Sequence, residues 1–259
     1  QGEEVLDFLQ HMKFEGLSPN SITFTCILKA CGSAGAIEKG KQMHEEIIGK
    51  GLLMNNISLG NALVDMYARC GVLEQAQETF DALQIWDVVS WSTLISGYAQ
   101  HGLGEEALAC FRQSLGHGIS PNPTIFLSVL CACSHSGLVN EGQMYFENMS
   151  KIYGIIPHAE HHSCMVDLFG RVGHFDKAIA VIIGMPSTNY LPLWDSLLGA
   201  CRKWGNVKLG RLAFEHVVKL ESNNEAAFIC MSNIYMAAGM VDEAETIEAM
   251  REKYYDKHP

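Results

Sequence analysis

The stretch GNALVDMYARCGVLEQAQETFD (Gly60–Asp81) consists of two amphipathic segments separated by a glycine. In the first segment, Leu63, Met66 and Tyr67 follow the i, i+3, i+4 spacing of one face of an α-helix. Gly71 then ends this helix, because glycine adopts the left-handed conformation of a helix C-terminus at little cost. The residues after Gly71 are again amphipathic, so the stretch predicts an antiparallel pair of helices.

This pattern occurs seven times along the chain, at spacings of 31 to 36 residues. Each copy has a glycine at the expected turn and, five positions later, a small residue that allows two helices to approach closely. One helix pair cannot bury both of its faces, so successive pairs are expected to stack. The turn glycines are Gly35, Gly71, Gly102, Gly137, Gly173, Gly205 and Gly239, and the small residues are Gly40, Ala76, Ala107, Gly142, Ala178, Gly210 and Ala244.

The repeats predict an all-α fold. No segment shows the alternation of apolar and polar residues that is typical of a β-strand. We expect about fourteen helices in stacked antiparallel pairs, which form a right-handed superhelical solenoid. The small residue of each copy is expected to face the first helix of its own pair.

Composition excludes several classes of protein. Hydrophobic residues make up 48% of the 259-residue chain and charged residues 18%, which excludes intrinsic disorder. The net charge of −11 argues against tight, nonspecific binding to duplex nucleic acid, but not against a local basic stripe. The longest stretch without a charged residue, Gln113–Asn140, contains Pro121 and Pro123, so neither a membrane span nor a membrane partner is predicted.

The nine cysteines form neither a metal nor a disulfide pattern. Their number is odd, none belongs to a C-x-x-C pair, and the nearest two are Cys131 and Cys133. This pattern disfavours a zinc ribbon and a disulfide framework. The cysteines are interpreted as small buried hydrophobic residues in a reducing compartment.

Several short stretches of sequence indicate which kind of repeat this is. ILKACGSAGAIEKGKQMH (Ile27–His44), the stretch Gly60–Asp81 and VVSWSTLISGYAQHGLGEEALACF (Val88–Phe111) resemble pentatricopeptide repeats of the plant PLS subclass. In that subclass normal (P), long (L) and short (S) repeats alternate, which fits the variable spacing better than the tetratricopeptide period of about 34 residues. LWDSLLGACRKWGNVKLGRLAFEHVVKLE (Leu193–Glu221) and MSNIYMAAGMVDEAETIEAMRE (Met231–Glu252) resemble the two extension motifs that follow the last repeats.

The resemblance covers the whole chain and implies an order of units. They are a partial P repeat (1–20), an L repeat (21–56), an S repeat (57–87), a P repeat (88–122), an L repeat (123–158), an S repeat (159–190), a first extension motif (191–224) and a second extension motif (225–259).

Members of this family bind single-stranded RNA with one nucleotide per repeat, and they read bases with the fifth and the last residue of a repeat. The resemblance implies one base for the pair Asn61 and Asp87, and a second for the pair Ser92 and Asn122. The family pairs Asn/Asp with U and Ser/Asn with A, so the sequence UA is expected, read 5′ to 3′. The implied base-reading residues are Thr25, Asn56, Asn61, Asp87, Ser92, Asn122 and Ser163.

A second interpretation applies to the last residues of the repeats. Asn56, Asp87 and Asn122 stand directly before predicted helices, where Asn and Asp are favoured N-caps, and capping is compatible with base reading. The later repeats depart from the family pattern, with Leu127 at a fifth position and Tyr190 at a last position. These repeats are expected to discriminate bases poorly.

Contacts to base planes and phosphates follow from the same resemblance. The second-position residues Ile22 and Val89 are expected to pack against bases. Arg69 and Arg171, two residues before a turn glycine, are expected to contact phosphates. A cation at this place also compensates the negative end of the helix dipole, so both roles are kept.

Proteins with these extension motifs usually act in C-to-U RNA editing in mitochondria or chloroplasts. In this chain the fifth positions of the extension motifs hold Asp195 and Ile229. A carboxylate repels phosphate and an isoleucine offers no hydrogen bond, so this region is not expected to read RNA. It is expected to dock a following editing deaminase domain or a recruited accessory editing factor.

No catalytic site is predicted in these 259 residues. A zinc deaminase needs H-x-E together with P-C-x-x-C, and the chain has no C-x-x-C. The H-x-E matches at His44–Glu46 and His158–Glu160 are interpreted as accidental surface residues. The cluster His158, His161, His162 and His174 could suggest a metal, but no spacing fits cleanly, and these histidines are interpreted as structural. No metal and no cofactor is expected.

The alternative hypothesis is a protein-binding scaffold that resembles tetratricopeptide proteins and holds peptides on its concave face. The acidic charge and the extension motifs favour it. In either case the predicted function is binding, with single-stranded RNA as the partner in the first hypothesis.

Overall fold

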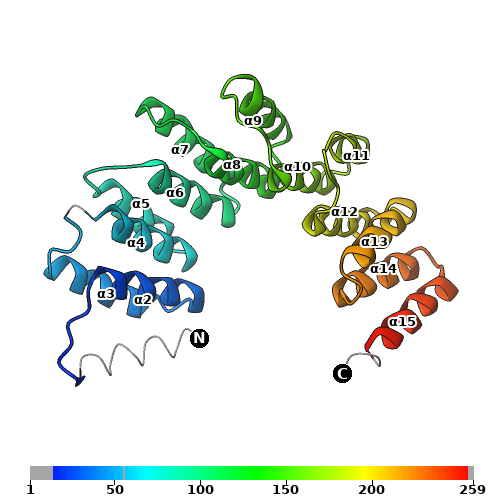
Figure 1. Cartoon of the computed structure of the whole chain (residues 1–259), viewed down its shortest axis with the longest axis horizontal. Helices are drawn as coiled ribbons and strands as arrows, with labels where there is room; N and C mark the ends of the chain where they lie inside the picture. The colour runs from blue at the N-terminus through cyan, green and yellow to red at the C-terminus, as the bar shows by residue number, and fades with distance from the viewer. Residues whose placement is uncertain (1–13, 55, 256–259) are drawn as a thin grey trace. The chain divides into compact units, whose positions relative to one another are not determined.

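The computed structural model describes residues 14–54 and 56–255, and this part of the chain contains fourteen α-helices and no β-strand (Figure 1). The predicted all-α fold is therefore confirmed. The helices are α2 (Ser21–Ala34), α3 (Ile37–Gly49), α4 (Ile57–Arg69), α5 (Leu73–Asp81), α6 (Val88–Gln100), α7 (Gly104–Gly116), α8 (Pro123–Ser136), α9 (Val139–Lys151), α10 (Ala159–Arg171), α11 (Phe175–Ile183), α12 (Leu191–Trp204), α13 (Val207–Leu220), α14 (Glu225–Ala237) and α15 (Val241–Tyr255).

Each sequence unit from residue 21 onward contains two helices, and its first helix begins at the first residue of the unit. Most of the predicted partial P repeat, residues 1–13, lies outside the described residues, as do residues 256–259 of the second extension motif.

The chain divides into two compact units, residues 1–132 and 133–259, with the division inside α8. In the first unit the first helices α2, α4 and α6 pack side by side, and α3, α5 and α7 each pack on the first helix of their own pair. In the second unit α10, α12 and α14 pack side by side, with α11, α13 and α15 as their partners.

First helices are more deeply buried than second helices. Nine of the thirteen residues of α4 are buried, against three of the nine residues of α5. The reason is that a first helix has neighbours on both sides and a second helix across it. Its remaining exposed strip is narrow, and the side chains on that strip are the ones available to a ligand.

The turn between paired helices has the predicted left-handed glycine. At Gly71 the backbone φ is +78°, and the amide of Val72 donates to the carbonyl of Tyr67 at 3.0 Å. This bond satisfies a carbonyl at the end of α4 that has no partner within the helix. All seven turn glycines have positive φ values, between 65° and 78°.

The small residue of each pair faces more than its own first helix. A Cβ atom added to Gly142 would lie 3.2 Å from Cβ of Cys133, on its own first helix, and 2.5 Å from Cδ2 of Leu168, on the next. At Gly40 the added atom would contact Met66 of α4, again the first helix of the following pair. The expectation that this residue faces only its own pair was therefore incomplete, because it lies where three helices meet.

Burial of the cysteines follows the prediction only in part. Burial raises the pKa of the Cys110 thiol to about 11 and that of Cys201 to about 12, as expected of inert core thiols. Cys26 is exposed on α2, which corrects the interpretation of all nine as buried. The other buried cysteines are Cys31 and Cys133, and the partly buried ones are Cys70, Cys131, Cys164 and Cys230.

Among the described residues, no helix combines the length and the apolar character that a membrane span requires.

Replacing Ala107 with Leu is predicted to lower the free energy of unfolding by about 1–3 kcal/mol, because Ala107 is fully buried and a larger side chain would overpack the contact between helices. Thermal or urea unfolding measures the effect. The control is Ala109→Leu, at a half-exposed position of the same helix, for which a change within about 0.5 kcal/mol is expected. Equal stability of the two variants would contradict the packing described here.

Candidate nucleic-acid interface

The predicted base-reading residues at the fifth positions lie in the second turn of a first helix and are largely buried. Asn61 and Ser92 are each 8% exposed, Ser163 is 9% exposed, and Thr25 is partly buried. The hydroxyl groups of Thr25 and Ser92 donate to backbone carbonyls of their own helices, at 2.9 and 3.0 Å. These small polar groups are therefore held in place before any ligand binds.

Asn61 differs from the other three residues. Its Oδ1 atom is fully buried and makes no hydrogen bond to any described residue. A buried carbonyl oxygen without a partner costs about 1–3 kcal/mol, and such groups are rare in folded proteins. A hydrogen-bond donor on a bound ligand would remove this cost once the amide turned to bring Oδ1 to the surface.

The predicted last-position residues are N-caps. Asn56 accepts from the amide of Leu59 at 3.1 Å and Asn122 from that of Ile125 at 2.9 Å. Asp87 accepts from the amide of Ser90 at 2.8 Å, within a capping box. The Nδ2 groups of Asn56 and Asn122 have no hydrogen bond within the described part of the chain, so their donors remain available.

Sequence analysis missed two residues of this kind, Asn20 and Asn224. Asn224 closes the first extension motif and caps α14 by accepting from the amide of Ala227 at 3.0 Å. Asn20 closes the partial repeat 1–20 and caps α2 through the amide of Thr23, at 3.0 Å. The signal was present, because Asn20 precedes Ser21 as Asn56 precedes the next predicted helix.

The predicted base-packing residues have exposed apolar side chains. Ile22 is 74% exposed and Val89 is 52% exposed, one residue after the start of their helices. Water covers these side chains in the free chain, so a stacked base would bury apolar surface there. The second positions of the other units are also exposed, namely Ser58, Thr124, Glu160, Pro192 and Ala226.

The two predicted phosphate-binding arginines are held by carboxylates. Nε of Arg69 lies 2.9 Å from Asp65, and Nε of Arg171 lies 2.7 Å from Asp167. Asp167 also accepts from the hydroxyl of Ser134 at 2.6 Å. Sequence analysis missed these partners, although D-x-x-x-R recurs at the same place in both predicted S repeats. The pairs orient the guanidinium groups at the last turns of α4 and α10.

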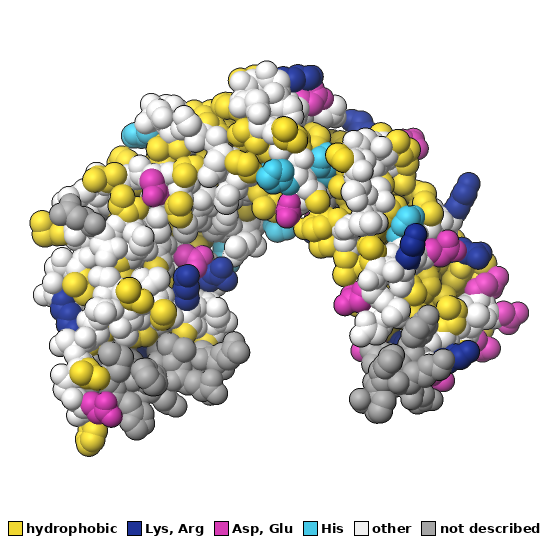
Figure 2. Space-filling model, viewed as in Figure 1, with side chains coloured by type: hydrophobic (Ala, Val, Ile, Leu, Met, Phe, Trp, Pro, Cys, Tyr) yellow, Lys and Arg dark blue, Asp and Glu magenta, His cyan; other side chains and the backbone are white. Residues whose placement is uncertain are grey.

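One face of the molecule carries charges of both signs. On the face shown in Figure 2, acidic and basic side chains are interspersed among polar and apolar ones. Interspersed charges favour local contacts to a ligand over long-range attraction.

The S repeat 159–190 departs from the family pattern. Its first helix, α10, is capped by histidines instead of by an Asn or Asp side chain. His158 and His161 form a capping box, in which the amide of His158 donates to Nδ1 of His161 at 3.1 Å. His162 bonds the carbonyl of His158 at 2.8 Å, and its ring packs edge-on against Phe146. These contacts support the structural interpretation of His158, His161 and His162.

Possible metal ligands do converge at this cap. Ligand atoms of His158, Glu160 and His161 lie within 4.8 Å of one another. However, Nδ1 of His161 accepts a backbone N–H, so the neutral ring carries its proton on Nε2. A histidine binds a metal through an unprotonated ring nitrogen, and in this state Nδ1 is occupied by the backbone N–H and Nε2 by its proton. The hydrogen bonds therefore fit a helix cap and do not fit a metal centre.

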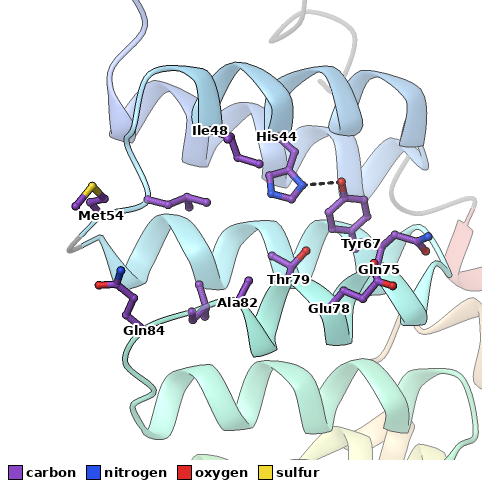
Figure 3. Close-up of a pocket in the computed structure, with 11 residues that line it drawn as sticks. His44, Ile48, Met54, Tyr67, Gln75, Glu78, Thr79, Ala82 and Gln84 are labelled. Atoms are coloured by element: carbon purple, nitrogen blue, oxygen red, sulfur yellow. Dashed lines mark hydrogen bonds between the residues drawn. The ribbon is translucent and has the colours of Figure 1, made fainter.

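The other H-x-E match corrects the sequence interpretation. His44 is not an accidental surface residue, because its Nδ1 is hydrogen-bonded to the hydroxyl of Tyr67 at 2.9 Å and burial lowers its pKa (Figure 3). Glu46 pairs with Lys50 at 3.0 Å. Both members of the motif thus have structural partners.

His44 and Tyr67 line a cavity of about 390 Å³ on the second-helix side of the first unit, between α3 and α5 (Figure 3). The exposed side chains Ile48 and Met54 stand at its edge. A cavity of about 330 Å³ occupies the corresponding place in the second unit and is lined by Phe146 and other residues of α9, α10 and α11.

Family models match most of these elements. A PPR repeat model matches residues 22–52, 89–119 and 160–189, a pentatricopeptide repeat domain model matches residues 2–34, and an E motif model matches residues 204–259. The chain belongs to the pentatricopeptide repeat family. The E motif match begins inside the predicted first extension motif, at the last residue of α12.

Curated relatives agree with this assignment. The chain is 43% identical over 235 residues to the chloroplastic pentatricopeptide repeat-containing protein CRR2 of Arabidopsis thaliana, which covers 91% of this chain and 36% of the relative. It is 38% identical over 256 residues to a mitochondrial pentatricopeptide repeat-containing protein of the same plant, and this match covers 98% of this chain and 46% of the relative. The chain thus spans less than half the length of these two relatives.

A solved structure shares the fold. The crystal structure of the pentatricopeptide repeat protein PPR10 in complex with an 18-nt psaJ RNA element matches with a TM-score of 0.75 and 18% sequence identity. The match covers 97% of this chain and 38% of PPR10. At this identity the likeness concerns the fold, and it supports the expected solenoid of pentatricopeptide repeats.

Asn61 and Asp87 are predicted to affect stability in opposite directions. Asn61→Ala removes a buried carbonyl without a partner and should leave the free energy of unfolding unchanged or raise it by up to about 1 kcal/mol. Asp87→Ala removes an N-cap and should lower it by about 1 kcal/mol. Urea unfolding of both variants tests this, and a clear loss of stability in Asn61→Ala would show that its side chain has a structural partner.

Proposed function

We propose that the chain is a sequence-specific module for single-stranded RNA that takes one base per repeat. The buried, unpartnered Oδ1 of Asn61 is the observation that carries this proposal. RNA is read through base edges in single strands, and a uracil offers its N3–H as a donor to such an oxygen. Asp87, at the end of the same repeat, is the second residue of the proposed U-reading pair.

Two further observations support RNA as the ligand. Ile22 and Val89 are exposed apolar side chains next to the base-reading positions, which suits packing against base planes. PPR10, which has the same fold, was solved with a bound RNA element. Ser92 with Asn122 forms the proposed A-reading pair. Thr25 with Asn56 serves the nucleotide before the U, and Ser163 serves the nucleotide two positions after the A.

Arg69 and Arg171 are proposed to contact phosphates. Their carboxylate partners Asp65 and Asp167 bind through Nε and hold each guanidinium group in one orientation. Orientation by a paired acid lowers the entropy lost on binding, but it also reduces the net positive charge. We therefore propose modest affinity, with specificity supplied by the base-reading pairs.

The proposed process is C-to-U RNA editing in a mitochondrion or a chloroplast, with the repeats in PLS order. The support is the E motif after the repeats, together with relatives named as chloroplastic and mitochondrial. The chain has no C-x-x-C, so the deaminase would be a domain outside these residues, fused or recruited through the extension motifs at 191–259.

A protein-binding scaffold is the second candidate. The cavities of about 390 and 330 Å³ on the second-helix side favour it, because each opens beside apolar side chains. A gel-shift titration separates the two hypotheses, since a scaffold would not distinguish a UA-containing RNA from a scrambled RNA of equal composition.

Asn61→Ser is predicted to move preference at one nucleotide from U toward G, because Ser with Asp is the family's G-reading pair. A base contact is worth about 1–3 kcal/mol, so competition between the U- and G-containing RNAs should change by at least about fivefold. Equal weakening of both RNAs would show that Asn61 does not read a base and that Asp87 acts only as a cap.

Arg171→Gln is predicted to weaken binding to all RNAs alike and to reduce the slope of log Kd against log salt by about 1. The matched control is Arg112→Gln, since Arg112 is exposed on the second helix α7. An unchanged salt slope in Arg171→Gln would show that Arg171 contacts no phosphate and serves only to compensate the helix dipole and to pair with Asp167.

A further inference from the structure

A cavity of about 700 Å³ lies between α10 and α12, where the last repeat meets the first extension motif. Its lining includes Asp167 and Arg171 on α10, and these residues follow the proposed base-reading Ser163 at four-residue intervals. Residues at i, i+4 and i+8 share one face of a helix. The cavity therefore continues the candidate RNA interface into the extension motif.

The opposite wall carries charges at both of its ends. Asp195 and Arg202 on α12 both line the cavity, and neither has an ion pair within the described residues. Seven residues separate them, which is two helical turns or about 10 Å along one face. Lys203 adds a second cation beside Arg202, and its Nζ donates to the carbonyl of Arg171 at 2.9 Å.

The floor between these charges is open. Gly199 lies halfway between Asp195 and Arg202, and a Cβ atom added there would meet nothing within 4 Å. The absent side chain leaves room for a flat group between the carboxylate and the cations. Partial burial, together with the charge of Glu221, raises the pKa of Asp195, as expected of a carboxylate that lacks a cationic partner.

We infer that this cavity holds one further RNA nucleotide, 3′ to the nucleotide at the last repeat, with its phosphate on Arg202 and Lys203 and an exocyclic amino group of its base on Asp195. At the exocyclic position cytosine has an amino donor, whereas uracil has a carbonyl oxygen that a carboxylate repels, so a carboxylate at this position favours cytosine over uracil. The inference rests on the proposed function, because it needs RNA in the preceding repeats. It revises the expectation that Asp195 keeps RNA away from the extension motif.

The pattern of charge favours a nucleotide over a purely anionic ligand. Asp167 is paired with Nε of Arg171, so the unpaired charges on the α12 wall are one carboxylate at one end and two cations at the other. A nucleotide with an amino-bearing base presents a donor at its base edge and an anion at its phosphate. A free phosphate or an acidic peptide segment would leave Asp195 without a partner.

The test uses the 259-residue chain and two fluorescent single-stranded RNAs. The shorter RNA ends at the nucleotide expected at repeat 159–190, and the longer one carries one more 3′ nucleotide, either C or U. We expect the added C to tighten binding by at least about threefold and the added U to give less. Arg202→Gln should remove most of the gain in affinity from either added nucleotide. Asp195→Asn should make the gains from C and from U equal.

Gly199→Leu fills the cavity without touching either charge. Leucine is a better helix former than glycine, so the variant should unfold at the same or a higher temperature, while the gain from the added nucleotide is lost. Its control is Gly116→Leu, at an equally open position on α7, which should keep the gain.

The outcomes separate this inference from the proposed function. If the shorter RNA binds and the added C gives no gain, the inference is overturned while RNA binding by the repeats stands, and the cavity serves another ligand class such as a protein segment. If neither RNA binds better than its scrambled version, the proposed function fails and the inference fails with it. If the added C and the added U tighten binding equally in the unmodified chain, Asp195 does not contact the base.

Discussion

The contact at which one second helix touches two first helices is the constraint on which the rest of the structure depends. At Gly142 this contact involves Cys133 of the same pair and Leu168 of the next pair, and it has no room for a Cβ atom without displacing one of them. Ala107 is likewise fully buried at the equivalent place. A small residue here fixes the distance within a pair and also the distance to the following pair, so one position sets both the repeat and its stacking.

Stacking at this distance determines what a ligand can reach. Because first helices lie side by side within each unit, the ends of α2, α4 and α6 present equivalent positions at repeated intervals. Caps such as Asp87 lie directly before those helices, and exposed second positions such as Val89 follow two residues later. The same backbone geometry thus serves folding, through capping, and leaves free the groups to which RNA binding is proposed.

Sequence patterns predicted the positions but not the states of these groups. That Asn56 and Asn122 would cap helices followed from their place before an apolar run, and the structure confirms it. That Asn61 would have a buried oxygen without a partner did not follow, because the neighbours of a side chain on adjacent helices are not encoded in local spacing. The pairing of Arg171 with Asp167 could have been predicted from an i, i+4 rule, whereas the bond from Ser134 to Asp167 could not, since it joins residues 33 positions apart.

By itself, the sequence determined the helix pairs, the turns at glycines such as Gly71, and the family, because helix periodicity, left-handed turns and repeat length are local properties. Tertiary structure decided which of the polar groups are satisfied and which are left for a ligand. His44 looked like part of a surface motif until burial and Tyr67 gave it a partner. Asp195 looked like an isolated acid until the packing of α10 on α12 formed the cavity that it shares with Arg171 and Arg202. The physical reason is that burial and pairing depend on helices brought together from distant parts of the chain, and a cavity exists only between such helices.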